Sequence, residues 1–598
     1  MEKSTNEQGS RPTSVDAQPR SNSHVSLVQE AVEKNEPIGA ELSKVASMTP
    51  ASPFAIFAIF TGLAFMIICI ALVRSKLPAV LFTLLSSDNI PMFFQDRSIV
   101  ATAIPKITSE FHSLPDVGWY GSAYLMATCC LQLFFGKLYA EFQVKWVFLS
   151  ALVLFEVGSV ICAAASSSVV LIVGRAVAGA GCAGLYSGAF ILIRFFIPVN
   201  ELPKYTGALG GMGGIAQTIA PTLGGVFTDK ATWRWCFWIN LPIGGITFLV
   251  ILSLVKIPAE SKVNKTHSLS DFISRFDLIG TLVFIPTIIC LLLALQWGGV
   301  KYAWGSWRII LLLTLFSVLL VVWVASQYLQ GDKATVPLSI IKQRSLAGGI
   351  LFVFCYFAAF FITTYYVPIW FQAVRTVSAY TSGINMLAAS AAMSVAVISS
   401  GFIVSKVGYY VPSMIASVVV LSIGSGLVYT FDRHTSTVKW AASLVVTGLG
   451  VGLGIQQPII AAQTIFKGPE LAIATSVLIF LQSLSGTVFL SVAQNVFEGK
   501  VQRVIQHTLP GVDAADVLGV GASDLGAAMK KKYPDQVDAI LDSYNAGLQT
   551  VFLMGVVFAC VSIVAIPLME WRSVKRKEEV APKPAQNAEG ASDTEKAA

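Results

Sequence analysis

Three charged residues interrupt runs of this chain that are otherwise apolar: Asp96, Glu156 and Arg175. A charge at membrane depth is costly and marks a functional site by default, and carboxylates in such positions commonly relay protons. Glu156 either pairs with Arg175 or hydrogen-bonds between helices. For Asp96, the alternative to a coupling role is a structural ion pair with the adjacent Arg97. We expect Asp96, Arg175 and Glu156 to carry proton coupling.

Arg175 lies in the stretch LIVGRAVAGAGCAG, far from Arg194 at the end of the same apolar run. That separation makes it hard for Arg175 to reach the membrane surface by snorkelling. A guanidinium also cannot lose its proton in a protein, so it acts as a fixed charge. Its position therefore favours a functional role.

Other chemistries lack the residues they would need. No Ser/His/Asp group or metal-ligand spacing is present, so we expect no enzyme and no metal site. The stretch 179–184 spells G-x-G-x-x-G, but no strand precedes it, and the glycines at 448–454 lack the Lys-Ser/Thr of a P-loop. We therefore expect no nucleotide and no cofactor, with an ion gradient as the energy source.

The composition places the chain among helical membrane proteins. Of 598 residues, 55% are hydrophobic and 13% charged, whereas soluble domains carry about a quarter charged residues. Taking each apolar run of about 18 to 25 residues as one span gives about fourteen helices. Their predicted centres are Phe65, Leu125, Leu154, Gly184, Gly214, Phe248, Ile285, Leu319, Phe360, Ala392, Leu421, Gly452, Phe480 and Val557.

Basic residues gather in alternate short loops, which the positive-inside rule places in the cytoplasm. The net charge of +7 is thereby explained without nucleic acid. An even number of spans puts both termini in the cytoplasm. Residues 1–50 form a polar, disordered N-terminal tail, residues 257–276 a cytoplasmic loop, residues 497–545 an extracellular loop, and residues 570–598 a C-terminal tail.

The first span is irregular. Arg74, Lys76 and Asp88 interrupt the region between two apolar pieces, and each charge at the centre of a span costs about 2.5 to 3.5 kcal/mol. Either residues 79–85 pack outside the bundle or residues 73–91 are an insertion in the gene model. We favour the insertion, because its removal leaves one span of ordinary length.

A glycine-rich run marks the predicted fifth span. The chain reads GALGGMGGIAQTIAPTLGG from 207 to 225, a composition that would destabilise a soluble helix. In a bilayer, small residues let two helices approach closely, and proline is tolerated as a bend. On physical grounds alone this is a packing face. Its members named for gating are Gly207, Gly210, Gly214, Pro221, Gly224 and Gly225.

Aromatic and amide side chains within the spans are candidates for lining a cavity for a large, partly apolar ligand. Most interfacial tryptophans and tyrosines only form the aromatic belt of a membrane protein. The candidates are Tyr124, Gln132, Gln372, Gln456, Gln457 and Gln482.

Four stretches occur in the same order as in a known family: QDRSIVATAIPKI, LIVGRAVAGAGCAG, the glycine-rich run, and WRWCFWINLPIGG. From about Met92 to Trp571 the chain resembles the fourteen-span drug:proton antiporters of the major facilitator superfamily, close to fungal toxin and multidrug exporters. The loop GKLYAEFQVKW departs from the family pattern, since its second glycine is missing. We expect the latch that this loop forms in the family to be weakened or rebuilt.

The resemblance implies an all-α major facilitator fold. Residues 51–256 and 331–569 would form two six-helix bundles, and residues 277–330 two linker transmembrane helices. The implied function is proton-coupled efflux of a toxin, secondary metabolite or drug by alternating access. The alternative is a proton symporter that imports a siderophore or nutrient.

The implied partners are membrane lipid and a small amphipathic or apolar organic substrate. We expect a monomer in the plasma membrane, with a vacuolar or vesicle membrane as the alternative.

Overall fold

The computed structural model describes residues 99–100, 103–104, 106–113, 116–254, 277–299 and 301–575. Asp96, the irregular stretch 73–91, the predicted loop 257–276 and both predicted tails, apart from the first residues of the C-terminal one, lie outside the described residues. The described part is built from helices, with isolated β-bridges between Gly298 and Tyr302 and between Tyr409 and Ser573.

The helices fall into three sets along the chain. The first set is α5 (Val117–Glu141), α6 (Val144–Ala163), α7 (Ser168–Phe196), α8 (Leu202–Lys230), α9 (Trp235–Trp238) and α10 (Asn240–Leu254). Two linker helices follow, α12 (Leu278–Trp297) and α13 (Trp307–Gln330), and then the short α14 (Leu338–Ile341). The last set is α15 (Arg344–Ala373), α16 (Ala379–Val407), α17 (Val411–Tyr429), α18 (Thr437–Gly454), α19 (Gln457–Ile465), α20 (Gly468–Thr508), α21 (Ala514–Leu518), α22 (Leu525–Lys532) and α23 (Val537–Val561).

Polar side chains start several of these helices, as expected for N-caps. Ser167, Ser306, Ser378 and Ser436 each accept a hydrogen bond from the backbone N–H three residues later. Asp277 caps α12 in the same way. These caps satisfy N–H groups that a helix start would otherwise leave without a partner.

Twelve helices in the described residues are long and apolar enough to cross a membrane, and each contains one predicted centre. A thirteenth predicted centre, Gly214, lies in α8, which has 29 residues but is not among the twelve. The centre at Phe65 lies outside the described residues. The helical membrane fold is confirmed, whereas the count of fourteen spans stays a prediction.

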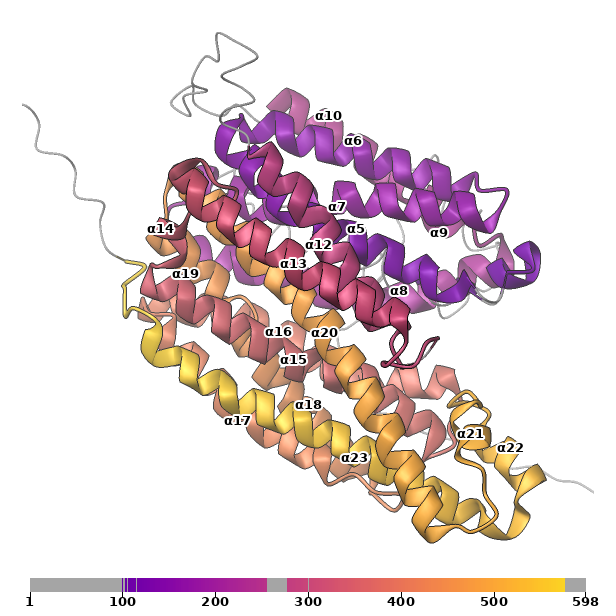
Figure 1. The fold of residues 1–598 in the computed structure, drawn as a ribbon. Helices are drawn as coiled ribbons and strands as arrows, with labels where there is room; N and C mark the ends of the chain where they lie inside the picture. Colours follow the sequence, from indigo (N-terminus) through magenta and orange to yellow (C-terminus); the bar gives the residue numbers. More distant parts are fainter. Residues whose placement is uncertain are drawn as a thin grey trace, which may run out of the picture. The chain divides into compact units, whose positions relative to one another are not determined.

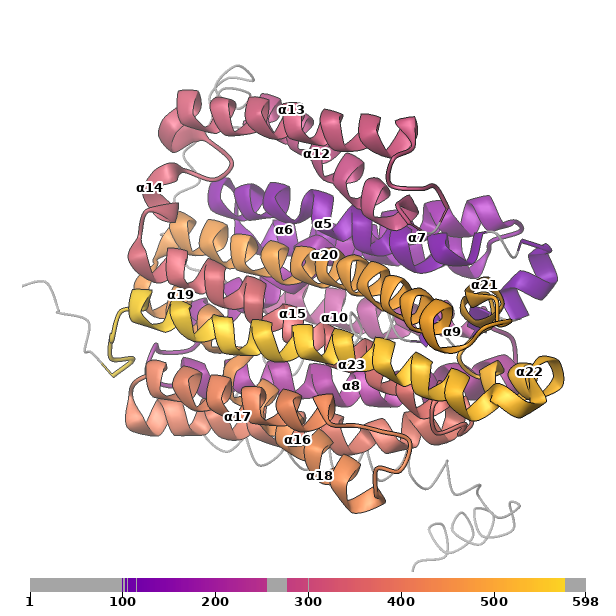
Figure 2. The same cartoon turned by 60° about the horizontal axis from the view of Figure 1, so that its bottom comes forward.

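The long helices run side by side and alternate in direction, so their ends form two opposite layers (Figures 1 and 2). One layer holds α14 and α19, and the other holds α9, α21 and α22. Helix ends bearing Lys137, Lys204, Arg344, Lys406 and Lys467 share the first layer. We call this layer the basic end and the other the outer end.

Glycines in α7 explain the G-x-G-x-x-G pattern. A Cβ added to Gly179 would lie closer than 3.0 Å to the backbone oxygen of Tyr124 on α5, and one added to Gly181 would meet the backbone of Phe155 on α6 in the same way. One added to Gly184 would meet the side chains of Ala151 and Phe135. These glycines let α5, α6 and α7 pack closely, so the pattern serves helix packing.

Candidate functional site

Arg175 lies buried between α5 and α7, with 1% of its surface exposed. Its Nε donates a hydrogen bond to the backbone oxygen of Tyr120 at 3.0 Å. The guanidinium carbon lies 4.3 Å from the ring centroid of Tyr124 and 5.9 Å from that of Phe237. A cation held over an aromatic face in a desolvated site is strongly stabilised. Arg175 therefore does not snorkel, and Tyr124 belongs to its immediate surroundings.

Glu156 occupies a different interface, between α6 and α10. Its carboxylate lies directly against Gly244, where an added Cβ would come closer than 3.0 Å to Oε1. In the same interface, Asn240 donates a hydrogen bond to Ser159 at 3.2 Å. Glycine at position 244 thus makes room for a carboxylate between two helices.

The glycine-rich helix α8 packs mainly against α16. It continues as one helix through Pro221 to Lys230. A Cβ on Gly207 would lie 2.8 Å from the backbone oxygen of Val397, and one on Gly214 would lie 2.6 Å from Oγ of Ser394. Reciprocally, a Cβ on Gly401 would lie closer than 3.0 Å to the backbone oxygen of Pro203.

Two further glycines receive polar side chains from across the interface. Gly210 of α8 faces the amide of Gln456, closer than 3.0 Å to an added Cβ, and Gly136 of α5 faces Ser476 of α20 at 2.6 Å. We use the name seam for the set of contacts described in this paragraph and the preceding one. Its members are Gly136, Pro203, Gly207, Gly210, Gly214, Ser394, Val397, Gly401, Gln456 and Ser476.

Hydrogen bonds also cross between the two helix sets near the seam. Gln463 of α19 donates to the backbone oxygen of Phe190 at 3.0 Å and accepts from Thr206 at 3.1 Å. Ser405 donates to the backbone oxygen of Asn200 at 2.6 Å. Sequence reasoning missed Gln463, although it is an amide in an apolar helix like the five glutamines that were singled out.

Toward the outer end, glycines on α5, α8 and α16 lack close neighbours among the described residues. Gly225 lies about three turns beyond Gly214 on α8, and Gly383 about three turns beyond Ser394 on α16. A Cβ added to either glycine, or to Gly121 on α5, would meet nothing within 4 Å. Gly224 is buried within α8. The interface between the helix sets is therefore closed at the basic end and loose at the outer end.

The five candidate glutamines fall into three groups by their hydrogen bonds and their location. Gln482 accepts a hydrogen bond from Tyr186 across the interface at 3.3 Å, and Gln457 donates to Leu453 and Ser400 within the last helix set. Gln372 lies at the outer end, where it accepts a hydrogen bond from Ser523. Gln132 and Gln456 are buried at 1% and 5% exposure. Neither Nε2 nor Oε1 of Gln132 has a hydrogen-bond partner in the described structure, and Oε1 of Gln456 also has none.

The loop that departs from the family pattern is held by different contacts. Lys137 is buried and lies 3.4 Å from the carboxylate of Glu141 on the next turn. It also donates to the backbone oxygen of Ala334 at 3.3 Å. Lys145 donates to the backbone oxygen of Leu252 at 2.8 Å. α5 is thus joined at the basic end to the segment that follows the linker helices.

Asp277 organises that segment. Its carboxylate is 2% exposed and accepts hydrogen bonds from Gln327, Gln330, Thr335 and the backbone N–H of Gly280, between 2.5 and 3.0 Å. Burial acts to raise the pKa of Asp277, but these hydrogen bonds outweigh it and hold the pKa below its ordinary 3.8. Sequence reasoning missed this residue, which stands at the start of an apolar run.

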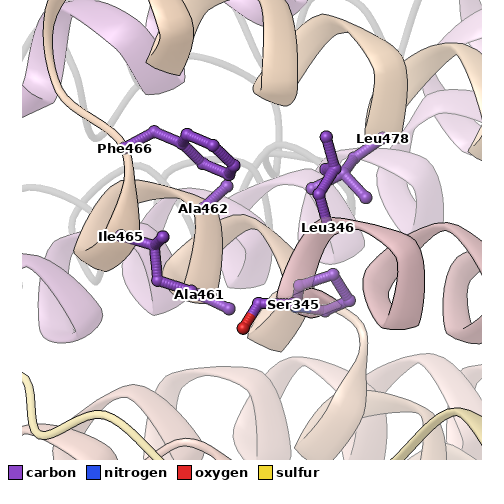
Figure 3. Close-up of a pocket in the computed structure, with 8 residues that line it drawn as sticks. Ser345, Leu346, Ala461, Ala462, Ile465, Phe466 and Leu478 are labelled. Atoms are coloured by element: carbon purple, nitrogen blue, oxygen red, sulfur yellow. The ribbon is translucent and has the colours of Figure 1, made fainter. Parts of the chain in front are cut away.

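A small pocket lies where α15, α19 and α20 meet near the basic end (Figure 3). Its empty volume is about 170 Å³, and it is too narrow to admit a water molecule. The walls are apolar except for Ser345. It is a packing defect within the last helix set and not a candidate binding site.

A family model described as Major Facilitator Superfamily matches residues 92–490. Efflux pump aflT of Aspergillus parasiticus is 47% identical over 482 residues, which cover 80% of this chain and 93% of the relative. MFS-type efflux pump MFS1 of Arthroderma benhamiae is 47% identical over 81% of this chain and 89% of its own length. The aspyridones efflux protein of Neocamarosporium betae is 46% identical over 81% of this chain and 85% of its own length.

Solved structures of the same family share the fold at low sequence identity. The proton:xylose symporter XylE matches with a TM-score of 0.52 and 13% identity, over 82% of this chain and 94% of that one. The human organic anion transporter MFSD10 matches with a TM-score of 0.50 and 11% identity, over 81% of this chain and 100% of that one. These likenesses concern the fold alone.

Proposed function

We propose that this chain, which belongs to the Major Facilitator Superfamily, is an efflux pump that exports a toxin, secondary metabolite or drug in exchange for protons. Membership in this family makes the chain a multi-pass membrane transporter and not an enzyme. What we propose beyond this membership is the direction of transport, the class of cargo and the energy source.

The observation that carries the proposal is the relationship to pumps named for efflux. Three relatives at 46 to 47% identity, each aligned over four fifths of this chain, bear such names. Two of the names identify no cargo beyond efflux itself, and one names aspyridones. We therefore propose a small organic metabolite as cargo and leave its identity to the experiment.

The seam supports transport by alternating access. The residues of the seam pack tightly at the basic end, whereas a Cβ added to Gly121, Gly225 or Gly383 toward the outer end meets no described atom within 4 Å. By the positive-inside rule the basic end is cytoplasmic. This arrangement suits a form that is closed to the cytoplasm and from which cargo leaves outward. The two bundles 51–256 and 331–569 would rock about the seam, with residues 277–330 as the linker.

Proton coupling is proposed for Asp96, Arg175 and Glu156. In the outward-facing form one carboxylate would take up a proton as cargo leaves, and in the inward-facing form it would release that proton to the cytoplasm. Arg175 is suited to bias a nearby carboxylate because it is buried and keeps its charge. Glu156 is suited because Gly244 lets it lie between helices at membrane depth.

Transport in inside-out plasma-membrane vesicles tests the proposal. An acidic vesicle interior should drive uptake of cargo, which corresponds to export from the cell, and Asp96→Asn or Arg175→Ala should abolish this uptake while leaving the protein in the membrane. Uptake into whole cells that rises with expression would instead identify the alternative, a proton symporter for a siderophore or nutrient. Unchanged transport in both variants would refute the coupling assignment.

A further inference from the structure

Three polar side chains near the interface between the helix sets have buried atoms without a hydrogen-bond partner in the described structure. Gln132, Gln456 and Ser476 are 1%, 5% and 0% exposed. Both amide atoms of Gln132, Oε1 of Gln456 and Oγ of Ser476 have no partner in the described structure. Proteins rarely leave buried polar atoms unpaired, so each such group requires an explanation.

The three side chains belong to different helices that meet at the seam. Ser476 of α20 lies against Gly136 of α5, and Gln456, at the break between α18 and α19, lies against Gly210 of α8. Gln132 stands one turn before Gly136 and therefore on the same face of α5. The facing glycines offer no side chain, and their backbone groups are already engaged within helices.

Other polar side chains at the interface between the helix sets do have hydrogen-bond partners. Gln463 donates one hydrogen bond and accepts another across the interface, with Phe190 and Thr206 as partners. Tyr186 and Gln482 likewise form a hydrogen bond across it. Gln132, Gln456 and Ser476 thus keep unpaired atoms although hydrogen bonds do form across this interface, and their chain neighbours Gln457 and Thr475 each leave one buried oxygen without a partner as well.

We propose that Gln132, Gln456 and Ser476 are the groups that recognise an uncharged organic cargo through hydrogen bonds when the seam is open. The inference rests on the proposed efflux function and names the class of its cargo. An amide and a hydroxyl each donate and accept, so together they suit carbonyl and hydroxyl groups on one molecule. None of the three carries a charge that could pair with an ionised cargo.

Closure of the seam then removes these groups from the cargo. With the seam closed, Gln456 and Ser476 face glycines and Gln132 is buried, so the cargo must have left their reach before closure is complete. The closed form keeps the cost of the unpaired groups, and opening toward the cytoplasm relieves that cost by exposing them to water or to cargo. Loading is thereby tied to the form that is open to the cytoplasm.

Replacing one of the unpaired groups by an apolar side chain of similar size should stabilise the protein against thermal unfolding. In the purified full-length protein without cargo, Gln132→Leu should raise Tm by about 1 to 3 °C, because it removes a buried polar group that gains nothing. The matched control is Gln463→Leu, which should lower Tm by a similar amount because it breaks two hydrogen bonds and leaves Thr206 unpaired.

Binding of two fluorescent probes tests the class of cargo. Nile red is uncharged and bears a ring carbonyl, whereas rhodamine 6G is a larger dye with a permanent positive charge. Gln132→Leu and Ser476→Ala should each weaken binding of Nile red at least about fivefold and change that of rhodamine 6G less than about twofold, since only the uncharged probe relies on these groups. Ser476→Ala removes a single oxygen and serves if the larger change prevents folding.

A fall in Tm for Gln132→Leu equal to that of Gln463→Leu would overturn the proposal. So would unchanged binding of Nile red, no binding of Nile red to the unsubstituted protein, or an equal loss for both probes. Neither Tm nor equilibrium binding depends on the direction of transport or on its energy source. Failure of the export proposal in vesicles is therefore distinguishable from failure of this one.

Discussion

The two ends of helices α5 and α8 differ in how they meet their neighbours. At the basic end, Gly136, Gly207 and Gly214 face atoms that an added Cβ would approach to 2.6 to 2.8 Å. At the outer end, Gly121 on the same helix as Gly136 and Gly225 on the same helix as Gly207 face nothing within 4 Å. Glycine is thus required for packing at one end and not at the other.

The burial of α16 and α20 follows the same division. Among residues 379–391 of α16 only Ser382 is buried, whereas most of residues 393–405 are buried. Residues 471–480 of α20 are all buried, and residues 481–484 are only partly so. The difference indicates that the interface between helix sets is tightened at one end, while each helix remains intact along its length.

The largest effect is expected from Gly401→Val, which places a branched side chain against the backbone of Pro203. Overpacking of this kind costs about 1 to 3 kcal/mol, and here it acts only on the closed seam. Transport should fall at least about tenfold. A cysteine introduced at Ser405, which lies beside Asn200, should become more reactive toward an impermeant maleimide added from the basic side.

The matched control for that experiment is Gly383→Val on the same face of α16. An added Cβ there meets nothing within 4 Å, so neither transport nor labelling at position 405 should change appreciably. Equal effects of the two substitutions would break the comparison between the ends.

A second prediction concerns Arg175, which lies in the outer half yet is buried within the first helix set. Arg175→Lys keeps a charge but loses the planar group that donates to Tyr120 and lies over Tyr124. Proton-driven transport should fall about tenfold or more. Exchange of cargo across vesicles without a proton gradient should persist, and its loss would point to a folding defect instead.

Asp277 provides a third test, at the basic end but outside the seam. Asp277→Asn removes the charge that accepts from Gln327, Gln330 and Thr335, at an expected cost of about 1.5 to 3 kcal/mol. Since the folded pKa lies below the ordinary 3.8, this contribution is present at neutral pH and is lost only as pH falls below about 4. Thermal unfolding of both proteins between pH 8 and pH 4 checks this.

The pH dependence separates two explanations of that result. The difference in Tm between the unsubstituted protein and Asp277→Asn should be constant from pH 8 to pH 5. A difference that shrinks between pH 7 and pH 6 would mean that another titrating group controls the segment.

The smallest effect is expected from Gly225→Ala at the outer end of α8. A Cβ added at this half-buried position meets no described atom within 4 Å, and alanine favours a helix over glycine by about 1 kcal/mol. Tm should stay the same or rise slightly, and transport should be retained. Loss of transport would show that the outer ends of the helices meet closely in another form of the protein.

Much of the fold follows from the sequence because long apolar runs admit few arrangements in a membrane. Twelve predicted centres lie in twelve separate candidate spans. α8 illustrates the limit of hydropathy, since glycine adds little to it although the helix is 29 residues long. A run without charged residues predicted this span, and the order of the surrounding motifs carried the resemblance to the family.

The residues of the site were harder to predict because their roles depend on which helix faces are in contact. The glycines of α8 look alike in the sequence, yet Gly214 is in tight contact and Gly225 is not. Gln132 and Gln463 are both amides in apolar helices, but only the second has partners. Gln372, chosen on the same grounds, contacts Ser523 at the outer end. Such distinctions arise from contacts between residues far apart in the chain.

The linker helix α13 has a consequence for the thickness of the surrounding bilayer. Only 6% of the most apolar part of this helix is buried by the described protein, so its surface is suited to contact with lipid (Figure 2). Trp307 and Tyr328, exposed at 68% and 76%, stand near its two ends, and the rise between them is about 32 Å. Aromatic side chains favour the two membrane surfaces, and about 32 Å is close to the hydrocarbon thickness of a typical bilayer, about 30 Å. The length of this helix between its aromatic ends therefore indicates the bilayer thickness that fits the protein.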